Sequence, residues 1–357
     1  MGHINKNAIL AMLALVPFSS CNKHKEVERV GEYSDKELVE TTAENVHATR
    51  IETSHIFGFP VDMRLVNDTT LVVFDVSAGE HACCLLSTSG KPMVNFCRKG
   101  KGHDEMVQPM SISVAEGRDT IYVYDNMIQR IHSYAVSDLL AGNAKPAVVT
   151  DISTWTEAVG YHPYRIDVTG DGRMISTYYR DIRMAMFEGG KSVNEYSKYP
   201  VVDEDMDNVR AIWRNTPPPG ISPDGRYYVT GTDYGAVLEV LEIGDEGFRQ
   251  VALKAYYRPE FRIVPSSTRN LSHIPDTYNG FSAFSACRKF FATSIVGMNS
   301  KERNNIIIYD YDGEIVKKVT VDCQVWRLCI NEDGDFYAIA KDMDLTDLYL
   351  YKGHVDL

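Results

Sequence analysis

The sequence lacks an excess of basic residues and lacks long helix-forming stretches. Lys and Arg number 37 against 49 Asp and Glu, which gives a formal charge of −12 over 357 residues. Nucleic-acid-binding proteins draw affinity from basic side chains that neutralise phosphates, so we expect no nucleic-acid partner. Stretches rich in Ala, Leu, Glu and Lys are scarce, whereas 21 Tyr, 13 Phe and 25 Gly recur along the chain. This composition argues against a helical bundle and favours β-structure.

Cysteine is also scarce, and no two cysteines have the CxxC spacing of metal-binding or thioredoxin-like sites. Beyond Cys21, several of the six remaining cysteines lie inside apolar, strand-like segments, where a small buried thiol is the usual finding. These six are Cys83, Cys84, Cys97, Cys287, Cys323 and Cys329. We therefore expect no metal, no cofactor and no redox site. The sequence leaves open whether any of the six pair.

The one long apolar run lies at the N-terminus. Lys6 precedes an apolar stretch from Ala8 to Phe18, and two serines then lead to Cys21. The run is too short for a permanent membrane-spanning helix and has the parts of a signal peptide. Small residues before a cysteine are what a lipoprotein signal peptidase recognises, although Phe18 replaces the usual leucine. We predict a lipoprotein signal peptide over residues 1–20 and lipidation of Cys21; the alternative is a secretory signal with an incidental cysteine.

The next stretch is polar and mixed in charge. We expect residues 21–49 to form a lipidated tether, in which Ser34 and Glu37 would cap a short helix. Residues 50–357 then form the folded body. This organisation places the protein in the bacterial cell envelope, lipid-anchored at the outer membrane on its periplasmic or surface side, with the anchor as its only membrane contact.

The folded body repeats one unit six times. A polar turn is followed each time by a β-branched and aromatic run, as in "VNDTTLVVFD" at 66–75 and "NEDGDFYAIA" at 331–340. Successive turns are 51, 52, 53, 63 and 46 residues apart. The equivalent turn positions are Asp68, Asp119, Asp171, Asp224, Cys287 and Asp333. Repeats at a steady period of this length indicate a repeat architecture.

Strand-like segments flank every turn and give four strands per unit. Six such units close naturally into an all-β, six-bladed β-propeller of four-stranded antiparallel blades. After the sixth turn only three strands remain, and the apolar stretch at 48–57 precedes the first unit. We predict that this N-terminal strand pairs with the last blade and closes the ring, which removes an open sheet edge. A β-sandwich or a string of hairpins would not explain the six-count.

Two units resemble known propeller repeats. Residues 100–134 resemble an NHL repeat, and "SPDGRYYVTG" at 222–231 looks like a TolB-type blade. The residues that match the NHL pattern are Gly100, Gly102, Pro109, Ile112, Val114, Ile121, Val123, Asp125, Arg130 and Ile131. Together with the lipoprotein signal that ends at Cys21 (a lipobox), these units make the chain similar to the TolB-like six-bladed propeller lipoproteins of Bacteroidetes. The resemblance implies fold and location, and little about chemistry.

Catalytic patterns are weak. Metal-dependent propeller enzymes hold a cation at the axis with Glu, Asn and Asp from the inner strands. The inner strands here offer few carboxylates, of which Asp167 is the clearest, and "GFSAF" at 280–284 lacks the second glycine of a nucleophile elbow. We therefore assign no catalytic residue, and the sequence does not decide whether the protein is an enzyme.

Arginine distribution is more informative. In a propeller, the links between blades and those between second and third strands open on one face around the axial funnel. Twelve of the twenty arginines fall in those links. They are Arg98, Arg130, Arg165, Arg180, Arg183, Arg210, Arg214, Arg258, Arg262, Arg269, Arg303 and Arg327. Aromatic residues accompany several of them, and arginine beside Trp or Tyr suits planar anionic or sugar-like ligands and protein hot spots. The competing reading is that these arginines pair with nearby carboxylates.

We therefore expect a monomeric binding propeller that holds an envelope protein or a small anionic or carbohydrate ligand on its funnel face. The predicted ligand-binding residues are Arg183, Trp213, Arg214, Arg258, Arg262, Trp326, Arg327 and His162. The alternative is a hydrolase or lyase acting on a carbohydrate or lactone, with His162 or His273 as the base.

Overall fold

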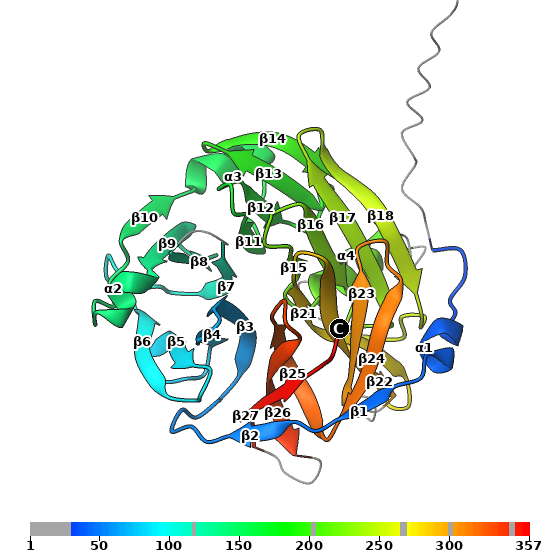
Figure 1. Ribbon diagram of the computed structural model, residues 1–357. Coiled ribbons are helices and arrows are strands. Elements are labelled where there is room, and N and C mark those ends of the chain that lie inside the picture. Colours follow the sequence, from blue (N-terminus) through cyan, green and yellow to red (C-terminus); the bar gives the residue numbers. More distant parts are fainter. Residues whose placement is uncertain (1–29, 116–118, 201–204, 265–269, 299–302, 343–346) are drawn as a thin grey trace, which may run out of the picture.

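A computed structural model describes residues 30–115, 119–200, 205–264, 270–298, 303–342 and 347–357. Six four-stranded antiparallel blades form a ring around a central axis, and the first strand of each blade lies nearest the axis (Figure 1). The predicted six-bladed β-propeller is confirmed. Each blade is too thin to cover its own faces, so the core consists of apolar clusters packed within and between neighbouring blades.

The first three blades follow one another along the chain. Blade 1 consists of β3 (Pro60–Asn67), β4 (Thr70–Asp75), β5 (His81–Ser87) and β6 (Pro92–Arg98). Blade 2 consists of β7 (Pro109–Val114), β8 (Thr120–Asp125), β9 (Arg130–Ala135) and β10 (Val148–Asp151). Blade 3 consists of β11 (Arg165–Val168), β12 (Met174–Thr177), β13 (Met184–Glu188) and β14 (Lys191–Tyr196).

The other three blades continue in order, and the last takes one strand from the N-terminal part of the chain. Blade 4 consists of β15 (Gly220–Ile221), β16 (Tyr227–Gly231), β17 (Val237–Gly244) and β18 (Gly247–Ala255). Blade 5 consists of β21 (Tyr278–Ala286), β22 (Phe290–Met298), β23 (Asn305–Asp310) and β24 (Ile315–Val321). Blade 6 consists of β25 (Cys323–Ile330), β26 (Asp335–Asp342), β27 (Tyr349–His354) and β2 (Thr49–Ile51).

The ring closes through β2, as the sequence predicts. β2 pairs antiparallel with β27, with Arg50 opposite Tyr351 and Ile51 opposite Leu350. The Arg50 guanidinium also lies 3.4 Å from the centre of the Tyr349 ring. Because the fourth strand of the last blade comes from the beginning of the folded body, the two ends of the domain are held together by main-chain hydrogen bonds.

The segment expected to be a tether packs on the ring over much of its length. Helix α1 (Lys36–Glu40) buries Leu38 in the apolar cluster of blades 4 and 5. Strand β1 (Glu44–Val46) then adds to blade 5 by pairing parallel with β24. Figure 1 shows α1, β1 and β2 following the perimeter of the ring. The predicted signal peptide (1–20) and Cys21 lie outside the described residues.

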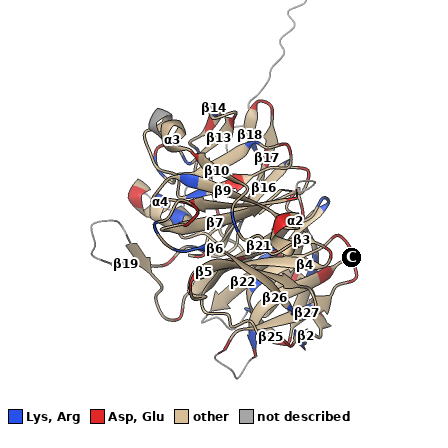
Figure 2. Ribbon diagram, turned by 90° about the vertical axis from the view of Figure 1, so that its left-hand side faces the viewer, with Lys and Arg blue, Asp and Glu red and all other residues tan. Residues whose placement is uncertain are grey.

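Three further helices and one hairpin interrupt the strand pattern. The helices are α2 (Val136–Leu140), α3 (Ser153–Val159) and α4 (Met206–Arg214). The hairpin β19 (Arg262–Val264) and β20 (Asn270–Ser272) lies in the long connection between blades 4 and 5 and stands out from the body (Figure 2). α4 lies beside β20. Of the helices described, none has the length and apolar character to cross a lipid bilayer.

Serine side chains join neighbouring innermost strands. Ser111 Oγ on β7 donates to the Ile166 carbonyl and accepts from the Ile166 N–H, at 2.9 and 3.2 Å. Ser113 bonds the backbone of Val168 in the same way. Adjacent innermost strands belong to different sheets, so these backbone groups would otherwise lack partners in the interior. The hydroxyls therefore hold the blades in register around the axis.

Tight turns end the innermost strands. Gly334, in the turn between β25 and β26, has φ +86°. A Cβ added there would lie 2.0 Å from the Val355 carbonyl oxygen. Only glycine fits both this backbone conformation and this close approach, which explains the Asp-Gly pair that marks the turn in the sequence.

Candidate functional site

The two ends of the ring carry different segments. We call one end the turn face, because it carries the turns between the first and second strands of each blade. The other end is the connection face, which carries the links between blades and between second and third strands. The six innermost strands surround the axis between these faces, so any axial site combines residues that are far apart in sequence.

Four charged side chains occupy the middle of the axis. Asp62 and Arg64 belong to β3, and Arg165 and Asp167 belong to β11. Asp62 Oδ2 accepts from Arg64 Nη2 and from Arg165 Nη2, each at 3.0 Å. Arg165 Nε also donates to Asp167 at 3.1 Å. Mutual pairing and hydrogen bonding compensate these charges for the loss of water.

Arg165 and Asp167 were noted in the sequence as a funnel-side arginine and an inner-strand carboxylate, whereas Asp62 and Arg64 were not predicted. A signal was present, because charged residues alternate along the first strand of the repeat, as Asp-x-Arg in blade 1 and Arg-x-Asp in blade 3. Residues two apart on a strand point to the same face. Such a pattern on an innermost propeller strand indicates charges that meet at the axis.

Arg327, a predicted binding residue, bonds three backbone carbonyls. Its Nε donates to Val61, and its Nη1 donates to Ser282 at 2.9 Å and Trp326 at 2.7 Å. Each of these carbonyls belongs to a residue skipped by a register shift in β3, β21 or β25. A β-bulge leaves its extra residue unpaired in the ladder. Arg327 therefore joins blades 5, 6 and 1, and burial lowers its pKa to about 10.

Arg183 and Trp213, also predicted to bind ligand, lie inside the protein. Their side chains are 1% and 0% exposed. Arg183 Nη1 lies 2.6 Å from Glu239 Oε2, and its guanidinium lies 4.1 Å from the Trp213 ring. This cation–π and ion-pair arrangement connects blade 3, α4 and blade 4. We assign both residues a structural role.

The other predicted residues lie on several links of the connection face. Arg214 is partly exposed at the end of α4. Arg258 and Arg262 are exposed on the connection that carries the hairpin. His162 is exposed, and its Nε2 lies 3.0 Å from Gln129 Nε2. Because α4 lies beside β20, which pairs with β19, Arg214 and Arg262 belong to neighbouring elements, whereas His162 belongs to the link before blade 3.

A different group gathers on the connection face between blades 4, 5 and 6. Its members, which we call the polar–aromatic cluster, are Asp233, His273, Asn279, Arg303 and Trp326. His273 Nε2 lies 3.1 Å from Asp233 Oδ2. The Arg303 guanidinium lies 4.5 Å from the centre of the Trp326 ring. Of these five residues, Trp326 was predicted from the sequence to bind ligand, and Arg303 was predicted to lie on this face.

Two donor groups of this cluster are buried without a hydrogen-bond partner among the residues described. They are Arg303 Nε and Trp326 Nε1. Buried polar groups are nearly always paired in folded proteins, so each unpaired atom calls for an explanation. Two unpaired donors in one cluster are suited to a bound ligand that accepts hydrogen bonds.

Charge in the cluster is set by its neighbours. The hydrogen bond that His273 donates to the Asp233 carboxylate raises the pKa of His273, and this effect outweighs the lowering by burial and by Arg303. Burial lowers the pKa of Arg303, which Asp233 partly offsets. The cluster therefore carries more positive than negative charge when His273 is protonated.

Close backbone contact fixes Asp233 and Asn279. Gly280 N–H donates to the Asp233 carbonyl at 2.6 Å, and Tyr234 and Asn279 form an isolated antiparallel bridge. A Cβ at Gly280 would lie 1.8 Å from the Gly235 carbonyl oxygen. Gly280 in β21 is thus required for the link after β16 to approach β21. This close approach positions the Asp233 carboxylate, which bonds His273.

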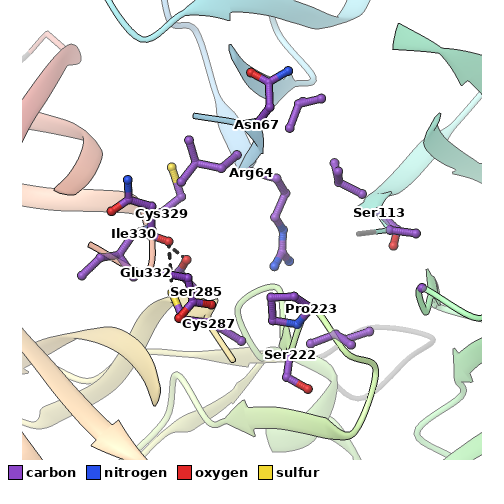
Figure 3. A pocket seen from close by; sticks show the side chains of 18 of the residues that line it. Arg64, Asn67, Ser113, Ser222, Pro223, Ser285, Cys287, Cys329, Ile330 and Glu332 are labelled. Carbon is purple, nitrogen blue, oxygen red and sulfur yellow. Dashed lines mark hydrogen bonds between the residues drawn. The ribbon is translucent and has the colours of Figure 1, made fainter. Parts of the chain in front are cut away.

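A cavity of about 270 Å³ lies on the axis at the turn face. All six innermost strands or the turns after them contribute to its wall, among them Arg64, Ser113, Ser222, Ser285 and Glu332. Figure 3 shows the Arg64 side chain reaching into the middle of the cavity, toward Pro223 and Ser222. The binding residues predicted from the sequence belong to the connection face, and this cavity on the turn face was not predicted.

No three His, Cys, Asp or Glu side chains in the described part of the chain are grouped so as to hold a metal ion. The six described cysteines are buried and unpaired.

Comparisons with known proteins agree with the architecture. The structure is similar to that of a protein named as exported from Bacteroides fragilis, with a TM-score of 0.54 and 11% identity over 92% of this chain and 98% of that one. A member of the DUF4221 family from Bacteroides vulgatus has a TM-score of 0.51 and 11% identity over 88% and 97% of the two chains. Identities this low show the fold alone. No curated protein matches the chain.

A family model described as TolB-like 6-blade propeller-like matches residues 38–333. The match begins in α1 and ends in the last Asp-Gly turn, so it covers blades 1 to 5 and the strands β2 and β25 of blade 6. The chain belongs to the TolB-like six-bladed propeller family.

Proposed function

We propose that this protein is an exported, lipid-anchored binding propeller whose polar–aromatic cluster holds an anionic group of a small ligand or of an envelope protein. The observation that carries the proposal is the pair of buried donors without partners, Arg303 Nε and Trp326 Nε1, beside the protonatable His273. A carboxylate on the ligand would satisfy these donors.

Charge around the Trp326 ring supports an anionic ligand. Arg303, Lys341 and Arg327 place their cationic groups 4.5, 5.4 and 6.0 Å from the ring centre. Asp233 is the carboxylate of the cluster and already bonds His273. Guanidinium groups offer paired donors to carboxylates, and aromatic rings add contact area. An anion would therefore bind against a local positive charge although the protein as a whole is acidic.

Catalysis as a hydrolase or lyase is the weaker candidate. His273 does have a carboxylate partner at 3.1 Å, which general-base chemistry would require. The raised pKa, however, keeps the imidazole protonated to higher pH, and a protonated ring cannot accept a proton. The same shift favours anion binding.

Two observations support export and anchoring. The lipobox ends at Cys21, and the structurally similar Bacteroides fragilis protein is named as exported. Cells that express the full chain should incorporate an alkyne-labelled fatty acid into it, whereas the Cys21→Ser variant should not. Equal labelling of both chains would refute lipidation at Cys21.

The binding proposal is tested with two sugars that differ by one carboxylate. We expect D-galacturonate to bind the purified protein and D-galactose to bind at least about tenfold more weakly, because a hydrogen bond to a charged group contributes about 1.5–3 kcal/mol. Arg303→Gln and Trp326→Phe each remove one unpaired donor and should weaken galacturonate binding. Arg258→Gln, an exposed arginine on the same face, is the matched control and should bind as the wild type does.

A partner protein is tested in parallel. Pull-downs from native envelope should recover a protein with the wild-type chain and with Arg258→Gln, and should lose it with Arg303→Gln. If no carboxylate ligand binds and all three chains recover the same proteins, the proposed site is wrong.

A further inference from the structure

We propose a second binding site, at the turn-face end of the axis, for a small zwitterion of amino-acid or dipeptide size. Its carboxylate would bind Arg64 inside the axial cavity, and its ammonium group would lie at the acidic rim. This site is distinct from the polar–aromatic cluster, because the axial ion pairs of Asp62 lie between the two ends of the axis.

The cavity limits the size of its ligand. Its volume of about 270 Å³ is near the lower end of the range of about 300–1,000 Å³ that is usual for small-molecule sites. Its wall combines apolar residues such as Ile112, Pro219 and Ile221 with polar and charged side chains. A volume of this size favours a small molecule that has both apolar and charged groups.

The inner end of the cavity carries positive charge. Arg64 uses Nε and Nη2 for Asp62, and Nη2 also donates to the Pro219 carbonyl at 2.7 Å. Its Nη1 has no hydrogen-bond partner among the residues described. Among the residues described, the guanidinium groups of Arg64, Arg165 and Arg327 face the carboxylates of Asp62 and Asp167, and Asp233, which also acts on Arg327, is paired with His273. The unbalanced positive charge favours an anionic group at Arg64.

The outer end carries negative charge. Asp68, Glu332 and Asp333 line the cavity from two turns and are exposed. Glu332 also accepts from the Arg288 N–H, which holds its carboxylate on the turn face. A ligand with one charge of each sign can lie along the axis with both ends compensated, whereas a simple anion would meet repulsion at the rim. This polarity is what points to a zwitterion.

Three peptides test the two ends separately. L-Ala-L-Ala carries both charges, N-acetyl-L-Ala-L-Ala lacks the ammonium group, and L-Ala-L-Ala amide lacks the carboxylate. We expect calorimetry to detect binding of L-Ala-L-Ala and at least about tenfold weaker binding of either blocked peptide. Equal binding of all three peptides, or absence of L-Ala-L-Ala binding at millimolar concentration, would overturn the proposal.

Variants assign the ends to residues. Arg64→Gln should weaken L-Ala-L-Ala binding about tenfold and leave the amide unaffected. The double variant Asp68→Asn, Asp333→Asn changes only exposed side chains, so it remains informative if Arg64→Gln does not fold. It should weaken L-Ala-L-Ala but not the N-acetyl peptide. Unchanged affinity for L-Ala-L-Ala in this folded double variant would refute the rim assignment.

The two proposed sites can be tested independently of each other. Arg303→Gln should leave L-Ala-L-Ala affinity unchanged, and the double rim variant should leave galacturonate affinity unchanged. If Arg303→Gln abolishes binding of both probes, the turn-face site is not separate, and the proposal of a second site is wrong.

Discussion

Arginine side chains have three different environments around the axis. Arg183 pairs with Glu239 in the interior, Arg327 bonds three carbonyls at the bulges, and Arg303 stacks on Trp326 with one donor unpaired. Only Arg327 has its bonding groups directed to carbonyls; Arg183, like Arg303, keeps a buried Nε without a partner among the residues described. The Arg183 side chain is 1% exposed and Arg303 is partly exposed, so accessibility together with unpaired donors distinguishes a binding role from a structural one.

Breaking the buried ion pair should destabilise the protein. Arg183→Met leaves Glu239 charged and buried without a cation, and this should cost about 3–5 kcal/mol of unfolding free energy. The double variant Arg183→Met, Glu239→Gln should recover part of the loss. Urea denaturation monitored by fluorescence measures both. Arg258→Gln is the exposed control, expected within about 0.5 kcal/mol of wild type; an equally small effect of Arg183→Met would contradict the assigned role.

Anion binding at the polar–aromatic cluster should depend on pH through His273. Asp233 raises the pKa of His273 above its usual value of about 6.5, against the opposing effects of burial and Arg303. Because the protonated ring attracts an anion, galacturonate affinity should be highest below the usual pKa of about 6.5 and should fall as pH rises through the raised pKa of His273. Titrations across this range should show the fall in wild type and a flatter profile in His273→Gln. Identical profiles would separate His273 from binding.

At the scale of secondary-structure elements, the short strands β1 and β2 have different roles in the ring. β2 completes blade 6, whereas α1 and β1 add to the outside of blade 5 through Leu38 and a parallel pairing with β24. β2 supplies the fourth strand of a blade that otherwise has three, whereas β1 adds a fifth strand to a blade that already has four. Contacts such as Lys318 Nζ to the Leu38 carbonyl at 2.7 Å attach the preceding segment to a ring that is already closed.

Two truncations should separate these contributions. A chain that begins at residue 48 keeps β2 and should remain a folded monomer of lower stability, because it loses the buried Leu38. A chain that begins at residue 54 exposes the edge of β27 and should aggregate or unfold at much lower temperature. Size-exclusion chromatography and thermal melting compare them. Leu38→Ala in the full chain, expected to cost about 2–5 kcal/mol, calibrates the loss of α1. Equal behaviour of the two truncations would mean that β2 does not close the ring.

At the scale of the whole molecule, polar and reactive groups are distributed unevenly. The net charge is −12, yet the axis holds more guanidinium than carboxylate groups. All six described cysteines are buried as free thiols. Burial raises the pKa of Cys84 and of Cys323 to about 12. The thiols therefore behave as core residues.

Thiol accessibility should report the integrity of the ring. In a Cys21→Ser chain, which leaves six cysteines, iodoacetamide should label almost none at neutral pH in the folded state and all six in urea. Intact-mass measurement counts the labels. Rapid labelling of the native protein, or fewer than six reduced thiols after unfolding, would contradict the buried free-thiol state.

Sequence patterns predicted the number of blades, the strand alternation and the closure by residues 48–57. These features depend on local periodicity, which is visible in the sequence, and on the number of strands that each blade needs. The placement of binding residues was less predictable. Arg183 and Trp213 occupy the right links in the sequence, but packing of α4 against neighbouring blades encloses them.

The tertiary structure alone decided which side chains meet. Asp62 and Arg165 are 103 residues apart and bond at the axis, and Asp233 pairs with His273 and acts electrostatically on Arg303 from a different link. The sequence by itself determined the ring, because five blades are built from consecutive residues and the sixth from the two ends of the repeat region. It could not determine the sites, because at the axis each blade contributes only one or two side chains and the spacing between blades carries no record of which of them touch.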